Sequence, residues 1–125
     1  RAGTEHHDLC VGDLTHMRTD TKRLFDAGLA LAVATWSDAK VEFDWGGIDW
    51  FVAHQTSVVH IGAMATALGV HSDRFPLTLP NYGNMGPAAV PFTLARHMDQ
   101  LHAEDRVLLM GIGSGLNTSF AEIVW

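Results

Sequence analysis

The stretch FVAHQTSVVH, residues 51–60, joins two patterns of different period and places His54 at the seam between them. The run IDWFVA, residues 48–53, is apolar and of strand length, as expected for a strand buried on both faces. Beyond the seam the apolar residues recur at helical spacing, at Val58, Ile61, Ala65 and Leu68. Gly69 then supplies a left-handed stop. The stretch predicts a strand-to-helix junction with a titratable side chain where the strand ends.

The rest of the chain extends this alternation of helices and strands. Residues 1–18 are polar and predict a loop with a short strand, after which Asp20 or Thr21 caps a helix. Pro87 suits the first turn of a later helix. The predicted elements are a helix over about 21–38, a strand over 48–53, a helix over 54–68, a strand over 77–79, a helix over 87–102, and strands over 106–113 and 118–125. This order is typical of a layered α/β arrangement.

Composition excludes several classes of protein. The 125 residues are 47% hydrophobic, which is enough to bury a core in one globular unit. The net charge of -6 argues against sequence-independent binding of nucleic acid, which needs a basic face. No apolar run is long enough to span a bilayer. Cys10 is the only cysteine, which fits a reduced cytoplasmic setting, and its neighbours Asp8 and Asp13 favour an inert thiol.

Polar side chains follow three of the predicted strands. His54, Asn84 and Ser114 come after the strands at 48–53, 77–79 and 106–113, respectively. Ligands bind at the carboxyl ends of strands in α/β sheets. The start of a helix favours a neutral imidazole that donates a hydrogen bond, and an asparagine amide is a second donor. Two donors that converge on one oxygen form an oxyanion hole, which acyl transfer and enolate chemistry require.

Each of these residues also has a purely structural interpretation. His54 is then a satisfied core histidine, and Asn84 is a turn residue or a helix cap. The run GIGSG, residues 111–115, lacks the G-x-G-x-x-G spacing of a dinucleotide loop and leads into a strand rather than a helix. Because the histidines outside the seam show no i,i+4 ligand pairs and the chain has one cysteine, we expect no metal site.

Three segments together resemble the active-site segments in the C-terminal half of a known superfamily. FVAHQTSVVH, NYGNMGPAAVP and VLLMGIGSGLNTSFAEIVW are similar to those of thiolase-superfamily condensing enzymes of the β-ketoacyl-ACP synthase III group. The resemblance is strongest to the OleA type, the acyl-CoA condensing enzymes of bacterial olefin and β-lactone biosynthesis. The segment EHHDLCVGDLTHMRTD also resembles that type. The resemblance implies the C-terminal half of a thiolase-like layered α/β/α fold, with a mixed sheet flanked by helices.

The resemblance also implies roles for individual residues. In that family a cysteine in the N-terminal half is acylated by a thioester, and the enolate of a second substrate attacks it. His54 and Asn84 match the pair that binds the second thioester's oxygen, and Ser114 matches the position whose backbone N–H holds the acyl-enzyme oxyanion. Substrate-binding glycines are expected at Gly83, Gly113 and Gly115. The implied substrates are acyl-CoA or acyl-ACP, without a cofactor.

The chain matches only one of the family's two similar halves. The nucleophile's motif is missing from it, and Cys10 falls in the lead-in segment instead. We therefore expect residues 1–125 to form a C-terminal half-domain that is inactive without a complementary N-terminal half bearing the catalytic cysteine. That half is either separately encoded or cleaved from the same precursor, and Arg1 in place of an initiator Met fits the second alternative. Thiolase-type dimerisation is expected in addition.

Three functions remain open at this point. The first is a Claisen condensation of two acyl-CoA molecules to a β-keto acid or thioester without decarboxylation. The second, on the same fold, is a decarboxylating malonyl-dependent synthase III, and the GIGSGLN ending favours the first over it. The third is a non-catalytic partner subunit that shapes an acyl tunnel. The presence of both His54 and Asn84 weighs against this third function, because a structural subunit has no need of the pair.

Overall fold

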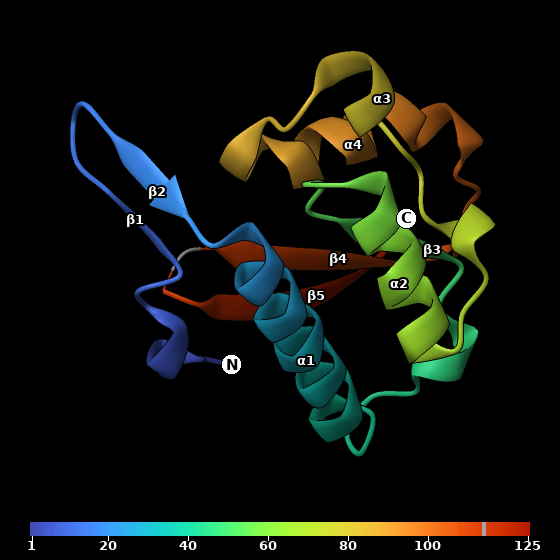
Figure 1. Cartoon of the computed structure of the whole chain (residues 1–125). Coiled ribbons are helices and arrows are strands. Elements are labelled where there is room, and N and C mark those ends of the chain that lie inside the picture. Colours follow the sequence, from blue (N-terminus) through green and yellow to red (C-terminus); the bar gives the residue numbers. More distant parts are fainter. Residues whose placement is uncertain (114) are drawn as a thin grey trace.

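The computed structural model describes residues 1–113 and 115–125, and a three-stranded mixed sheet lies at the centre of these residues (Figure 1). The middle strand is β4 (Arg106–Gly113). It runs parallel to β3 (Trp50–Ala53) and antiparallel to β5 (Asn117–Val124). These are the predicted strands over 48–53, 106–113 and 118–125, with small shifts of their ends. The mixed α/β fold class is confirmed.

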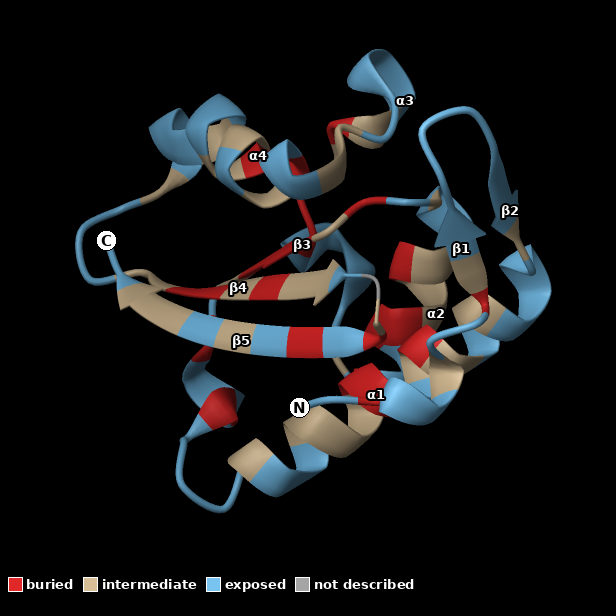
Figure 2. Ribbon diagram, turned by 90° about the vertical axis from the view of Figure 1, so that its left-hand side faces the viewer, coloured by how far each residue is buried: buried red, intermediate tan, exposed pale blue. Residues whose placement is uncertain are grey.

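Helices cover both faces of this sheet (Figure 2). α1 (Thr21–Ala39) and α2 (Val58–Leu68) pack against each other on one side, while α4 (Ala89–His97) lies against β3 and β4 on the other. A one-turn helix, α3 (Leu79–Tyr82), precedes α4. Short 3-10 helices within the described residues span Thr4–His6, Trp45–Gly47, Ser72–Arg74, Gly86–Ala88 and Met98–Gln100. The layers are therefore helices, sheet and helix.

The predicted helix ends are confirmed where capping chemistry sets them. The Asp20 carboxylate accepts a hydrogen bond from the Arg23 backbone N–H at 3.1 Å and begins α1. Gly69 ends α2 with a φ of 71°, in the left-handed region that favours glycine.

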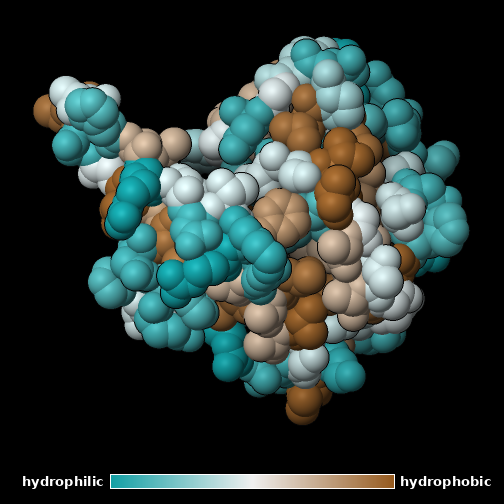
Figure 3. All heavy atoms as spheres, viewed as in Figure 1, coloured by the Kyte–Doolittle hydropathy of each residue, from teal (hydrophilic) through white to brown (hydrophobic). Residues whose placement is uncertain are grey.

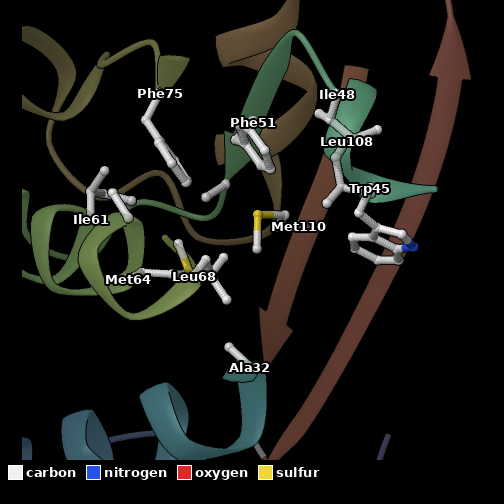
Figure 4. Close-up of a cluster of buried hydrophobic side chains, with 12 residues drawn as sticks. Ala32, Trp45, Ile48, Phe51, Ile61, Met64, Leu68, Phe75, Leu108 and Met110 are labelled. Atoms are coloured by element: carbon white, nitrogen blue, oxygen red, sulfur yellow. The ribbon is translucent and has the colours of Figure 1, made fainter. Parts of the chain in front are cut away.

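The hydrophobic core fixes the carboxyl end of β3 (Figure 4). Phe51 lies opposite Leu108 in the parallel register, and its ring stacks on Phe75 with centroids 5.0 Å apart. The same cluster takes in buried side chains from α1, α2 and β4, namely Ala32, Ile61, Met64, Ala65, Leu68 and Met110. These contacts fix β3 within the core. His54, the residue that follows β3, therefore has a defined position.

A small hairpin occupies part of the segment predicted as a loop. β1 (Cys10–Gly12) pairs antiparallel with β2 (Met17–Thr19), and the hairpin projects from the body of the molecule (Figure 1). The Asp13 carboxylate accepts the backbone N–H groups of Thr15 and His16 at 2.7 and 2.8 Å and closes the turn. The short strand predicted in residues 1–18 is present, and it has a second strand as its partner.

Three predicted elements differ from the structure. The strand at Leu77–Leu79 is wrong: the chain has no strand partner there, and its backbone groups are hydrogen-bonded to Gln55 instead. The helix expected from His54 begins at Val58, because Ser57 before it has an extended backbone. The helix expected over 87–102 is α-helical only from Ala89 to His97 and has 3-10 turns on either side.

Candidate active site

His54 stands at the carboxyl end of β3 and faces a cavity. Its backbone N–H donates to the Met110 carbonyl at 2.8 Å, which continues the pairing of β3 with β4 by one residue. The side chain is half-buried. Burial lowers the pKa of His54 below its ordinary value of 6.5, and a hydrogen bond with the Gly86 backbone acts in the opposite direction. The ring is therefore neutral at pH 7.

The cause of this neutrality differs from the one expected from the sequence. We predicted that the positive end of a helix dipole would disfavour the imidazolium. However, α2 begins only at Val58, and desolvation is the larger effect on the pKa of His54. The dipole of a helix acts mainly within its first turn, and three residues separate His54 from that turn.

Asn84 lies in the loop between α3 and α4, and its side chain has a fixed orientation. Its Oδ1 accepts the Gly86 backbone N–H at 2.9 Å. A backbone N–H can only donate, so the side-chain atom facing it is the carbonyl oxygen, and the Nδ2 amide points elsewhere with its protons available. Gly86 has a φ of 56°, a left-handed conformation that suits glycine. Asn84 is thus preset as a hydrogen-bond donor, although it follows a short helix rather than the predicted strand.

His54 and Asn84 line one cavity of about 420 Å³, which also reaches Gly113 at the end of β4. This volume is within the range of small-molecule sites. Apolar side chains form much of the wall: Leu24, Phe25, Ile112 and Leu116. The hairpin contributes Cys10 and Thr19, whose Sγ and Oγ1 atoms are 3.4 Å apart. The structure therefore brings the two predicted donors together beside a space with largely apolar walls.

The other predicted site residues are Ser114 and three glycines, and among those that the structure describes only one lines the cavity. Ser114 lies outside the described residues. Gly113 lines the cavity, Gly83 lies beside Asn84, and Gly115 lies beside Leu116 of the cavity wall. A larger hollow of about 750 Å³ lies at the loop after α1, and none of the predicted site residues line it. We place the site at the His54 cavity because the donors converge there.

Two residues of this region were not assigned a role from the sequence. The His60 ring packs on Phe25 with centroids 3.9 Å apart and lines the same cavity. Burial lowers the pKa of His60, and the nearby His54 lowers it further. Gln55 is buried under the site. Its signal in the sequence is an amide directly after His54 at the end of an apolar run.

Neither a metal centre nor a membrane-spanning helix is found in the residues that the structure describes. No group of three or more histidine, cysteine or acidic side chains is arranged to hold a metal ion in residues 1–113 and 115–125. Within the same ranges, every helix is too short or too polar to cross a bilayer.

Residues 39–125 match the sequence family described as 3-oxoacyl-[acyl-carrier-protein (ACP)] synthase III C terminal. The chain belongs to this family. Among synthase III relatives, the acyl-CoA:acyl-CoA alkyltransferase of Xanthomonas campestris pv. campestris is 40% identical over 100% of this chain and 38% of its own length. The protein of the same name from Shewanella oneidensis is 32% identical over 97% of this chain and 38% of its length.

The fold agrees with solved structures of the synthase III family. A variant of Xanthomonas campestris OleA with bound lauric acid and lauroyl-CoA has a TM-score of 0.94 at 40% identity, covering 100% of this chain and 38% of that one. The resemblance to the synthase III group and its OleA type is confirmed. The chain spans about 38% of the length of the relatives that it matches.

Proposed function

We propose that residues 1–125 are the His- and Asn-bearing C-terminal half-domain of an acyl-thioester condensing enzyme. The reaction is a Claisen condensation of two acyl-CoA molecules, with the first acyl group held on a cysteine of an N-terminal half that this chain does not contain. The observation that carries the proposal is the convergence of His54 and the oriented Asn84 amide on one cavity with apolar walls. The enzyme pairs the two halves and dimerises as thiolases do.

The two donors act on the second acyl-CoA. A general base accepts its α-proton and leaves an enolate, whose oxygen accepts hydrogen bonds from His54 and from Asn84 Nδ2. The α-carbon then attacks the carbonyl of the acyl-cysteine thioester. A carbon–carbon bond forms, the carbon–sulfur bond to the enzyme breaks, and the cysteine leaves as a thiolate. The product is a β-ketoacyl thioester, which hydrolysis converts to the β-keto acid.

The neutral state of His54 sets a condition on this step. A neutral imidazole has a single N–H, so the proposal needs that proton on the ring nitrogen that faces the cavity. A charged oxygen is a strong acceptor, so the hydrogen bond from His54 strengthens when the enolate forms.

The first oxyanion, on the acyl-enzyme, is assigned to a different donor. We place the backbone N–H of Ser114 there, with Gly83, Gly113 and Gly115 giving the substrate close access to the backbone. Gly113 supports this, because it lines the same cavity as His54. Acylation and condensation thus use separate donors and are separable in an experiment.

Two alternatives use the same surface differently. A decarboxylating synthase III would form the enolate from a malonyl thioester, and His54 and Asn84 would bind the same oxygen. Two relatives that are 40% and 32% identical over 100% and 97% of the chain are named as acyl-CoA:acyl-CoA alkyltransferases, which favours two acyl-CoA substrates. A non-catalytic subunit that shapes an acyl tunnel would not require the fixed orientation of Asn84.

The test uses a protein in which this chain is joined by its N-terminal half. We expect His54→Ala and Asn84→Ala each to slow condensation of two acyl-CoA molecules by about a hundredfold or more, the loss typical of one oxyanion donor. The burst of cysteine acylation should change much less. His71→Ala and Asn81→Ala are matched controls, because both side chains are exposed and lie outside the cavity.

Three outcomes would contradict the proposal. Normal condensation by a folded His54→Ala variant removes the catalytic assignment of His54. Turnover of malonyl thioesters but not of paired acyl-CoA supports the decarboxylating alternative. Absence of turnover with every thioester, in a protein that contains both halves and is folded, supports the non-catalytic subunit.

A further inference from the structure

Gln55 makes a complete set of hydrogen bonds beneath the candidate site. The residue is 1% exposed. Its Nε2 donates to the Pro76 carbonyl at 2.8 Å, and its Oε1 accepts the backbone N–H groups of Thr78 and Leu79, each at 2.9 Å. These contacts replace the strand pairing that this segment lacks. Both ends of the Gln55 amide are therefore committed to the segment that leads into α3.

The same amide also reaches α4. Gln55 Nε2 donates to Thr93 Oγ1 at 3.3 Å, and the hydroxyls of Thr93 and Thr78 are 2.7 Å apart. Thr78 and Thr93 are 2% and 0% exposed. Polar groups this deeply buried are held strongly, because leaving any one of them without a partner is unfavourable. Gln55, Thr78 and Thr93 thus form one buried network that joins the end of β3 to the segment before α3 and to α4.

The position of this network bears directly on the two donors. Gln55 is the next residue after His54. Asn84 lies in the stretch between Leu79 and Thr93, and the network fastens both of those residues. The loop that carries Asn84 is therefore held at each end to the neighbour of His54. No other buried polar side chain of the described residues links these segments.

We propose that Gln55 is a positioning residue, which sets the separation of the His54 ring and the Asn84 amide through its hydrogen bonds to Pro76, Thr78 and Leu79. This inference rests on the proposed function of His54 and Asn84. Gln55 does not touch the substrate. Its effect arises because a donor displaced by about 1 Å loses roughly a hundredfold in rate.

The test replaces Gln55 in the protein that contains both halves. Gln55→Met keeps a long unbranched side chain and removes every hydrogen bond of the amide. We expect the kcat of condensation to fall by roughly ten- to a hundredfold, with little change in KM or in the cysteine-acylation burst. Gln100→Met is the matched control, because Gln100 is an exposed glutamine that does not line the cavity. Its kcat should equal that of the unmodified protein.

A double-mutant cycle separates positioning from stability. If Gln55 acts by placing Asn84, then Gln55→Met combined with Asn84→Ala should be about as slow as Asn84→Ala alone, since no amide remains to be placed. A merely structural Gln55 would give additive losses, or a lower melting temperature with normal turnover per folded molecule. Either of these results, with Asn84→Ala slow as expected, overturns the inference and leaves the proposed function in place.

Two further variants keep the inference testable if Gln55→Met does not fold. Thr93→Val removes only the hydroxyl contact and should give a smaller kcat loss that is also non-additive with Asn84→Ala. Gln55→Glu, when ionised, keeps the acceptor for Thr78 and Leu79 but cannot donate to the Pro76 carbonyl. Its kcat should therefore lie between those of Gln55→Met and Thr93→Val. Normal kcat in both variants overturns the inference. Normal condensation by His54→Ala and Asn84→Ala overturns the proposed function, and the inference with it.

Discussion

His54 and His60 both have pKa values below the ordinary 6.5, because each ring is partly buried beside the same cavity. A charge on His54 also disfavours a charge on His60, whose pKa it lowers further. In the proposed mechanism, a neutral His54 ring donates its hydrogen bond to the enolate oxygen. The two rings together make the folded protein sensitive to acid.

The first prediction concerns this sensitivity. A histidine with a lowered pKa in the folded state binds its proton more readily when unfolded, so acid favours unfolding. Stability contributed by neutral His54 and His60 is fully present above pH 6.5 and declines as the pH falls from 6.5 through their lowered pKa values. We expect the melting temperature of the protein with both halves to fall across this window.

Two variants check the origin of that fall. His60→Phe should flatten the decline, because it removes one titrating ring and keeps an aromatic side chain against Phe25. His71→Asn should leave it unchanged, because His71 is exposed. An equal decline in the unmodified protein and in His60→Phe would show that other groups control the acid response.

At the scale of single residues, the sequence predicted the hydrogen-bond donors better than the residues that surround them. His54 and Asn84 stand out because a titratable ring and an amide follow apolar or glycine-rich runs. Gln55 could not be assigned a role, since its partners lie 21 to 38 residues away along the chain and only the fold shows that they surround it. His60 falls within a helical pattern, and the pattern alone does not show that its ring meets Phe25.

At the scale of elements, prediction succeeded where local chemistry decides the structure. The Asp20 cap, the Gly69 stop and the long apolar strand over 106–113 are encoded in consecutive residues. The predicted strand at Leu77–Leu79 failed for a non-local reason. Its composition suits a strand, but a strand also needs a neighbour, and the Gln55 side chain takes the hydrogen bonds that a neighbour would have made.

The second prediction tests how α2 ends. Gly69→Ala should lower the free energy of unfolding by about 1 kcal/mol or more, because Gly69 has a φ of 71° that alanine adopts at a cost. Gly62→Ala is the matched variant in the interior of the same helix, where a Cβ meets no atom within 4 Å. It should raise the free energy of unfolding by about 0.5–1 kcal/mol.

Denaturant titration of both glycine variants decides the point. Opposite signs are expected from two identical substitutions in one helix. Equal effects would mean that Gly69 is not what stops α2, and that the loop after it is held in place by its tertiary contacts alone.

At the scale of the whole molecule, apolar side chains remain exposed on several surfaces. They gather over α2 in the view of Figure 3, where Val58 and Val59 are exposed, and at the tip of the projecting hairpin, where Leu14 and Met17 are 105% and 77% exposed. Contiguous apolar surface on a soluble protein marks a site of contact with another chain or domain. Such surface fits the proposal that a further half of the enzyme covers it, and the relatives are longer than this chain.

The third prediction follows from this surface. Residues 1–125 produced alone should self-associate, because Val58, Val59 and the hairpin tip have no covering partner in this chain. The same residues joined to the N-terminal half of a synthase III relative should give a defined dimer that unfolds cooperatively. Sedimentation velocity and calorimetry on both proteins measure the difference.

Val59→Lys should reduce self-association of the chain alone, whereas Glu42→Lys, also at an exposed position, should not. A monodisperse monomer of residues 1–125 with a single cooperative transition would show that the half-domain is stable without a partner, and the apolar surface would then need another explanation.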